Sequence, residues 1–314
     1  MTPLTNIPLR RYILRYRDNA REPDMFGSKG RWYKGNLHMH SVLSDGKLEP
    51  DEVRQMYKDA GYDFAALTDH WSLSENLPAK DGFLELSGVE YDTGDMINGK
   101  VFHILGIGMD RPAFDETRHD IPVEKIVSGI KECGGIAILA HPAWSVMDPD
   151  DISRLDGIAG AEIYNTVSDP NNYNCRRADA SLYFDLWADK GYMIPAFAAD
   201  DSHWYTGEQL QSYIMVKAEA LTKDAIFDAI AKGHFYASQG PEFTSITRKD
   251  NKVIVRFGGA DKILFVSNSV FNINRVQDGS LGIAVYEFTA TDKYVRVELI
   301  SEDGKIAWSS PIKK

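Results

Sequence analysis

Short apolar runs alternate with amphipathic stretches over most of the chain. Runs of strand length predict strands at residues 31–40, 63–70, 83–91, 100–108, 136–142, 157–165 and 192–203. Apolar residues spaced three and four apart predict helices at 49–62, 122–135 and 175–191, and a helix with a short strand at 222–238. The first of these helices should begin at Pro50, with acidic residues in its first turn, and end at Gly61.

This alternation predicts an α/β fold with a parallel sheet and helical crossovers. Seven such strands favour a distorted seven-stranded (β/α) barrel of the TIM-like kind over a small open sheet. From Glu242 onward the pattern has a period of two with turn signals between the runs, which predicts a small all-β, sandwich-like domain. We therefore expect an N-terminal extension at 1–34, a barrel at 35–241 and a C-terminal β domain at 242–314.

The composition is that of a globular protein, with 314 residues, 43% hydrophobic and 26% charged. The formal net charge of −11 argues against a general nucleic-acid surface or an anionic membrane surface, because both partners favour a basic face. An anionic substrate stays open, since bound cations can reverse the local field.

The two cysteines, Cys133 and Cys175, form neither a C-x-x-C metal motif nor a disulfide framework. Arginines interrupt the N-terminal segment, so we expect no signal peptide, and no apolar stretch is long enough to predict a membrane span. A cytoplasmic protein is the expectation; the sequence does not indicate its oligomeric state.

Six of the eight histidines fall on or just after predicted strands, and three carboxylates share those positions. His38 and His40 lie two residues apart, so in a strand they would project to one side. Carboxyl ends of barrel strands converge on one face, where gathered imidazoles and carboxylates need a cation. The candidate ligands exceed what one tetrahedral ion needs, which favours two or three ions: His38, His40, Asp45, His70, Glu90, His103, His141, Asp201 and His203.

The alternative is that each histidine is an ordinary core or surface residue, which is what we expect of His119 and His234. We also expect Asp69 and Asp200 to orient ligands without binding metal themselves.

Seven dispersed motifs resemble, in order, those of the polymerase and histidinol phosphatase (PHP) superfamily: "HMHSVLSDG", "ALTDHW", "GVEY", "FHILGIG", "AHPAW", "EIYN" and "DDSHW". They span about residues 35–240. "GHFYASQGP" also resembles the segment that closes this domain in bacterial members predicted to be metal-dependent phosphoesterases.

The resemblance implies a two- or three-metal centre. His38, His40 and Asp201 would bind one ion, and Glu90 would bridge it to a second ion held by His103 and His141. Asp45, His70 and His203 would form a third position. Some members have histidine in place of Asp45, so the occupancy and metal of this position are open. Zinc, manganese and iron all suit mixed imidazole and carboxylate ligands.

We predict a metal-dependent phosphoesterase that hydrolyses a small phosphorylated substrate through a metal-bound hydroxide, with Glu90, Asp201 and His203 as catalytic residues. Neither a glycine-rich phosphate loop nor a nucleophilic serine motif is present. Two alternatives stay open: an amidohydrolase-type C–N hydrolase, and a non-catalytic metal-binding module whose β domain docks a glycan or a partner.

Substrate-binding candidates follow from position alone. Arg176 and Arg177 could hold a phosphate or simply begin a solvated helix. Tryptophans beside the proposed ligands could stack a ring or pack the barrel rim; they are Trp71, Trp144 and Trp204, of which Trp204 is the predicted substrate contact. Glu162 and Asn165 could orient substrate or a ligand.

Overall fold

The computed structural model describes residues 24–27, 29–94, 100–172 and 176–314. Its helices are α2 (Pro50–Asp59), α3 (Val123–Glu132), α4 (Ser181–Asp189) and α5 (Lys223–Ala231), with 3-10 turns η1 (Pro149–Arg154) and η2 (Thr166–Ser168). The predicted helices at these places are confirmed. In α2, the Glu52 carboxylate accepts the Glu49 backbone N–H at 3.0 Å, and Pro50 occupies the first turn, so local sequence fixes where this helix starts.

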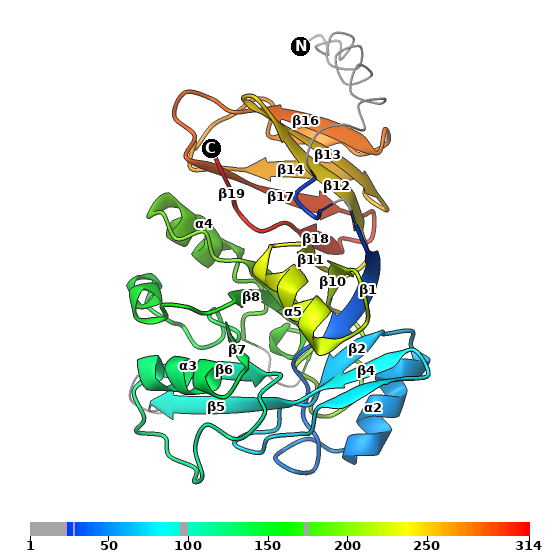
Figure 1. The fold of residues 1–314 in the computed structure, drawn as a ribbon. Helices are drawn as coiled ribbons and strands as arrows, with labels where there is room; N and C mark the ends of the chain where they lie inside the picture. The colour runs from blue at the N-terminus through cyan, green and yellow to red at the C-terminus, as the bar shows by residue number, and fades with distance from the viewer. Residues whose placement is uncertain (1–23, 28, 95–99, 173–175) are drawn as a thin grey trace.

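One long mixed sheet runs through most of the molecule (Figure 1). Its order is β15 (Val276–Asp278), β14 (Lys262–Val266), β17 (Tyr294–Ile300), β18 (Ile306–Trp308), β11 (Phe235–Ser238), β10 (Tyr213–Ala218), β1 (Arg31–Asn36), β2 (Phe64–Ala66), β4 (Phe83–Leu86) and β3 (Leu77–Lys80). A further strand, β19 (Ile312–Lys313), pairs with β17.

Two smaller sheets complete the fold. The first orders β5 (Gly88–Gly94), β6 (Val101–Ile107), β7 (Ile136–Leu139), β8 (Gly160–Asn165) and β9 (Ala196–Ala199). The second orders β12 (Glu242–Lys249), β13 (Lys252–Gly258) and β16 (Ile283–Glu287). In Figure 1, β12–β19 gather at the top of the view and the strands of the five-stranded sheet lie below them.

The mixed α/β class is therefore confirmed, but a closed seven-stranded barrel is not found. The expected barrel strands divide between two sheets, and β6 runs antiparallel to both β5 and β7. Six residues separate Gly94 from Val101, whereas a parallel connection needs about a dozen or more. The short link forces the chain to reverse there, which the apolar pattern does not reveal.

The predicted third strand also divides in two. Its first half is β4, which pairs with β2, and its second half is β5, which pairs with β6. The change of sheet falls at Ser87 and Gly88. A Cβ at Gly88 would lie 2.3 Å from the carbonyl oxygen of Leu67, so only glycine permits this close approach.

Single β-bridges join the long sheet to the five-stranded sheet beside the candidate site. Met39, after β1, pairs with Ser202, after β9, and His70, after β2, pairs with Glu90 in β5. These bridges bring together strand ends that are far apart in the sequence.

Apolar side chains fill the space between the sheets and their helices. One group packs α3 and α4 against the five-stranded sheet, a second packs α5 against the long sheet, and a third lies between β12, β13, β16 and the C-terminal strands. Cys133 is buried and free, and Cys175 lies outside the described residues. Among the described residues, no helix combines the length and apolar character that a membrane crossing requires.

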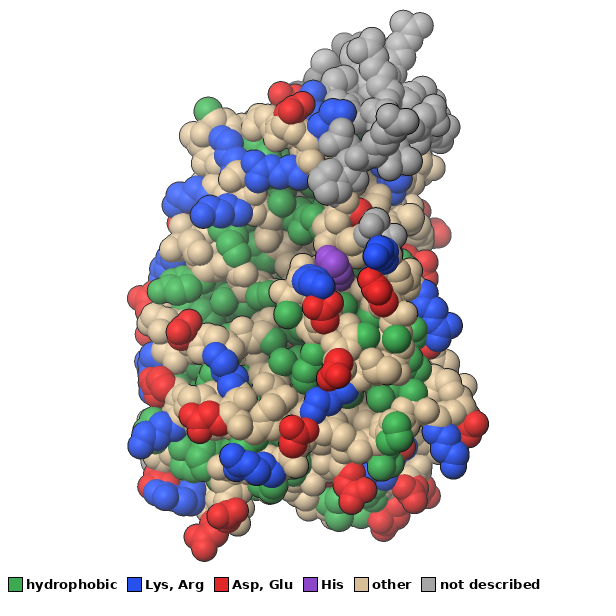
Figure 2. Space-filling view, in the orientation of Figure 1, with side chains coloured by type: hydrophobic (Ala, Val, Ile, Leu, Met, Phe, Trp, Pro, Cys, Tyr) green, Lys and Arg blue, Asp and Glu red, His purple; other side chains and the backbone are tan. Residues whose placement is uncertain are grey.

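The long sheet crosses the expected limit of the C-terminal domain, because β18 pairs with β11 through Ala237–Trp308 and Ser238–Ala307. The domain limits at 34/35 and 241/242 stay predictions. Lysine, arginine and carboxylate side chains are interspersed over the face drawn in Figure 2, without a continuous field of one sign.

Candidate metal centre

His38 and His40 follow β1 directly, and both side chains are fully buried. Their Nε2 atoms both lie 3.1 Å from Oδ1 of Asp201, and 3.2 and 3.1 Å, respectively, from Oε2 of Glu90. The four side chains offer ligand atoms within 4.8 Å of one another. The adjacent imidazoles in the sequence thus converge on two carboxylates supplied by β5 and by the end of β9.

Glu90 stands at the centre of a larger set. Its Oε1 lies 2.8 Å from Nδ1 of His103 and 3.4 Å from Nε2 of His141, while its Oε2 faces His38 and His40. One carboxylate thus touches both predicted groups of ligands. Such a position suits a bridging ligand between two ions.

A third group lies on the other side of His40. The Oδ2 atom of Asp45 is 3.4 Å from Nε2 of His203 and 3.9 Å from Nε2 of His70, and the ring of His40 stacks on that of His203 at 4.1 Å. These four residues form the second compact set, and His70, Glu90 and His103 form a third. His141 belongs to none of the three compact sets.

The structure thus brings all nine predicted ligands together, and we call them the histidine–carboxylate cluster. Four of its buried polar atoms have no hydrogen-bond partner among the described residues: His40 Nε2, His70 Nδ1, His103 Nε2 and Asp201 Oδ1. His40 Nε2 lies 3.1 Å from Asp201 Oδ1, and His70 Nδ1 lies 3.5 Å from Glu90 Oε2, so both pairs are in ion-pair contact without forming a hydrogen bond. These atoms are the kinds that zinc, manganese and iron bind, so the donor set fits divalent ions.

The histidines and carboxylates of the cluster shift one another's pKa values. Burial opposes charging of His40, but Asp201 and Glu90 outweigh it and raise its pKa to about 9. Burial likewise opposes ionisation of Glu90, and the surrounding histidines outweigh it and hold its pKa well below the usual range. Carboxylates likewise outweigh burial and raise the pKa of His38 and His103, whereas burial lowers the pKa of His70. A divalent ion would displace any proton from the nitrogen that binds it.

Backbone geometry at two ligands is unusual. His141 and Asp201 adopt positive φ angles of 26° and 53°, in the region that favours glycine. Strained backbone of this kind persists where surrounding contacts fix it and is common at functional sites. For Asp201 the fixing contact is its own N–H, which donates to the His38 carbonyl at 2.9 Å.

Glu162 and Asn165 lie behind the cluster. Oε1 of Glu162 is 2.7 Å from Nδ1 of His38, and its Oε2 accepts hydrogen bonds from the His141 backbone and from Nδ2 of Asn165. Asn165 also approaches Oδ2 of Asp201 at 3.2 Å. Both side chains are buried, so the geometry favours a positioning role over the substrate contact suggested by sequence.

The loop that carries His203 is held by two buried carboxylates. Asp200 accepts the N–H groups of Leu210, Gln211 and Ser212 at 2.7–2.9 Å. Asp200 is thus an orienting residue, as expected.

The second carboxylate is Glu208, which accepts the N–H groups of Trp204 and Tyr205 at 2.6 and 2.5 Å. The sequence did not predict this role for Glu208, because an acidic residue in a polar loop carries no distinguishing pattern. Asp69 serves the loop after β1 in the same way, accepting the Ser41 N–H at 2.7 Å and the Ser44 hydroxyl at 2.7 Å. It too orients neighbours of the ligands, as expected.

The remaining substrate-binding candidates are less closely tied to the cluster. Arg176 and Arg177 are exposed, and no described contact joins their side chains to it. Trp204 stacks on the His203 ring at 5.3 Å, Trp144 packs edge-on to His141 at 4.9 Å, and Nε1 of Trp71 donates to Asp92 at 2.7 Å. All three indoles are half-buried, which suits ring stacking and rim packing equally.

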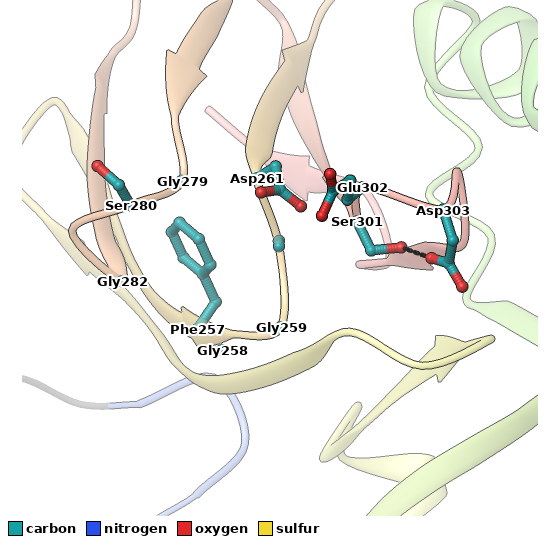
Figure 3. Close-up of a pocket in the computed structure, with 11 residues that line it drawn as sticks. Phe257, Gly258, Gly259, Asp261, Gly279, Ser280, Gly282, Ser301, Glu302 and Asp303 are labelled. Carbon is teal, nitrogen blue, oxygen red and sulfur yellow. Dashed lines mark hydrogen bonds between the residues drawn. The ribbon is translucent and has the colours of Figure 1, made fainter.

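A cavity of about 750 Å³ lies elsewhere, among the loops of the C-terminal strands (Figure 3). Phe257, Asp261, Glu302 and Asp303 line it, together with glycines and Ser280. None of the nine cluster residues lines this cavity.

Solved structures give the fold a clear relative. The chain is similar to a two-domain protein from Bacteroides vulgatus ATCC 8482 that contains a predicted PHP-like metal-dependent phosphoesterase, with a TM-score of 0.52, 16% identity, and coverage of 94% of this chain and 99% of that chain. At this identity the likeness establishes a shared fold.

Two further structures match at lower scores. An amidohydrolase from Chromobacterium violaceum with bound sulfate and no metal has a TM-score of 0.42, 19% identity, and coverage of 55% and 89% of the two chains. A candidate metal-dependent phosphoesterase from Bifidobacterium adolescentis has a TM-score of 0.41, 14% identity, and coverage of 63% and 96%. No protein-family model and no curated protein matches the chain.

Proposed function

We propose that this protein is a metal-dependent phosphoesterase that hydrolyses a small phosphorylated substrate. The observation that carries the proposal is the cluster around Glu90, in which nine ligand-type side chains meet and four buried ligand atoms lack a hydrogen-bond partner. Two of these atoms, His40 Nε2 and Asp201 Oδ1, lie 3.1 Å apart without forming a hydrogen bond, and divalent ions would give all four atoms a partner.

The residues would divide among two or three ions. His38, His40 and Asp201 would hold one ion, His103 and His141 a second with Glu90 between them, and Asp45, His70 and His203 a third. Divalent ions there would activate water and neutralise charge on the phosphoryl oxygens.

The chain contributes orientation. Glu162 fixes the His38 ring through Nδ1, and the Asp201 backbone carbonyl lies 2.7 Å from Nδ1 of His203. Each contact leaves the opposite nitrogen, Nε2, facing the cluster. Glu90, Asp201 and His203 would thus serve catalysis as metal ligands that are held in fixed positions. This role suits phosphoryl transfer, which depends mainly on positioning and electrostatics.

The test combines metal analysis with turnover. Purified protein loaded with manganese or zinc is analysed for metal per chain and assayed with p-nitrophenyl phosphate and bis-p-nitrophenyl phosphate. We expect two or three ions per chain and hydrolysis of one of the esters, and the preferred ester identifies a monoesterase or a diesterase.

Two results would count against this function. Chains that bind metal but hydrolyse neither ester would favour C–N hydrolysis or a binding module. Chains that bind no metal under any loading condition would remove the basis of the proposal.

A further inference from the structure

A histidine outside the cluster is linked to it by one carboxylate. Asp92 lies in β5, two residues after Glu90. Its Oδ2 is 2.5 Å from Nδ1 of His119, and its Oδ1 accepts the Trp71 indole N–H and lies 3.9 Å from Nδ1 of His70. The same carboxylate therefore holds an outer histidine and approaches a member of the cluster.

The two partners differ in their contact with solvent. The His119 side chain is 56% exposed, whereas that of Asp92 is 14% exposed. The His119 carbonyl accepts the Gly94 N–H at 2.9 Å and the Thr93 hydroxyl at 3.1 Å, so β5 also fixes its backbone. His119 is thus an anchored residue whose imidazole reaches the surface beside the cluster.

The contact with Asp92 decides which ring nitrogen is free. With Nδ1 held by the carboxylate, Nε2 is the ring nitrogen left for another partner, and no side chain in the described parts of the chain bonds it. A histidine held in this way by aspartate can transfer a proton at Nε2. Histidines that bind an ion through a ring nitrogen lack a proton at that nitrogen, whereas Nε2 of His119 is free to carry one.

We propose that His119, oriented by Asp92, is the general acid for the reaction, an inference that rests on the phosphoesterase function proposed above. Water supplies the hydroxyl group that joins phosphorus, and the bond from phosphorus to the leaving oxygen breaks. The leaving oxygen keeps the electron pair of that bond and takes the proton from Nε2 of His119. The proton released by the water restores His119 through solvent, so the net reaction is ester plus water to phosphate plus alcohol.

The charges around His119 are few. Asp92 faces it from β5, and the other oxygen of that carboxylate lies 3.9 Å from Nδ1 of His70. On its own segment, Arg118 and Asp120 bind each other at 3.0 Å. The indole of Trp71 packs edge-on at 5.9 Å.

Leaving groups of different acidity separate acid catalysis from a structural role. We would compare wild-type protein with His119→Asn, whose amide can still donate to Asp92 but cannot supply the proton, and with His119→Ala. Each is loaded with manganese, analysed for metal, and assayed with p-nitrophenyl phosphate and with phenyl phosphate, whose leaving group is more basic. His234→Ala is the control for removal of a histidine outside the site.

General acid catalysis contributes about 10²–10⁴-fold. We therefore expect both His119 variants to lose about 100-fold or more in kcat/KM on phenyl phosphate and much less on p-nitrophenyl phosphate. Their metal content should equal that of the wild-type protein. The fall in wild-type kcat/KM for phenyl phosphate at alkaline pH should also disappear. Equal losses on both esters, or recovery of activity by His119→Asn, would overturn the role. Wild-type protein inactive on every ester would refute the phosphoesterase function and this inference with it.

Discussion

Two groups of charged side chains in this protein are satisfied in different ways. In the C-terminal sheet, Arg296 is 1% exposed, and its guanidinium donates to Glu298 at 2.6 Å and to both oxygens of Asp185 at 3.1 and 3.2 Å. There the chain supplies its own cation, and it ties β17 to α4.

Among the described residues, no lysine or arginine forms an ion pair with the carboxylates of the histidine–carboxylate cluster, whose ion-pair partners are histidines. Four of its ligand atoms have no hydrogen bond there. A buried charge group closed by its own arginine is structural, whereas one with unpaired ligand atoms requires a ligand from outside. The contrast predicts that changes in the first set alter stability and that changes in the second alter metal content and activity.

The largest effect should come from Glu90→Gln. The substitution keeps the side-chain shape but removes the charge that faces five histidines. We therefore expect metal content to fall and hydrolysis to drop by more than about 100-fold, beyond the loss typical of residues that only support ligands. Metal analysis measures the metal content per chain, and an ester assay measures the loss of hydrolysis. His234→Ala should retain both properties, and a fully active Glu90→Gln protein would show that the cluster is not the site.

Arg296→Met should act on stability alone. It leaves Glu298 and Asp185 facing each other without a cation, and breaking a buried pair in this way costs about 3–5 kcal/mol. Denaturant unfolding of the metal-free protein measures the loss. Adding Glu298→Gln and Asp185→Asn should recover part of it. Metal per folded chain should stay at the wild-type value, and a fall would mean that the two sets are coupled.

Glu162→Gln should weaken metal binding without abolishing it. Glu162 orients His38 but offers no atom to the compact ligand sets, and loss of such a supporting residue costs about 10–100-fold in affinity. Competition with a chelator measures the change. The exposed Glu287→Gln in β16 is the matched control, and an unchanged affinity in Glu162→Gln would argue against a positioning role.

The smallest effect concerns Asp292, a carboxylate that the C-terminal region satisfies with neutral donors. Burial opposes its ionisation, but hydrogen bonds outweigh this and lower its pKa: Ser269 and Ser267 donate at 2.6 and 2.8 Å, and the Thr289 N–H at 2.7 Å. Because the folded pKa is depressed, this stabilisation is present above the unfolded value of about 3.9 and is lost as pH falls through the folded pKa.

Asp292→Asn should therefore lower the free energy of unfolding by about 1–3 kcal/mol at pH 7, with a smaller difference from wild type in acid. Unfolding at neutral and acidic pH, in metal-free protein, tests this. A difference that stays constant with pH would mean that the charge of Asp292 is not what stabilises the fold.

Local sequence was sufficient to predict several features of the fold. Pro50 and its acidic neighbours marked the start of α2, and alternation of apolar and polar residues marked most of the strands. The pattern did not predict β10 (Tyr213–Ala218), which lies between the predicted strand at 192–203 and the predicted helix at 222–238. The directions of the strands could not be predicted either, because an apolar run such as residues 100–108 looks the same in parallel and antiparallel sheets.

The identity of the ligand-type residues could be taken from sequence, because imidazoles and carboxylates at strand ends have few other uses and His38 and His40 share one face by simple periodicity. The family resemblance implied how these residues would be grouped, but only the tertiary structure gave the contacts between them and the positions of their neighbours. Glu162 meets His38 across 124 positions, and His119 meets Asp92 across 27. Periodicity specifies which face a side chain occupies, but the side chain it meets there depends on how distant strands pair.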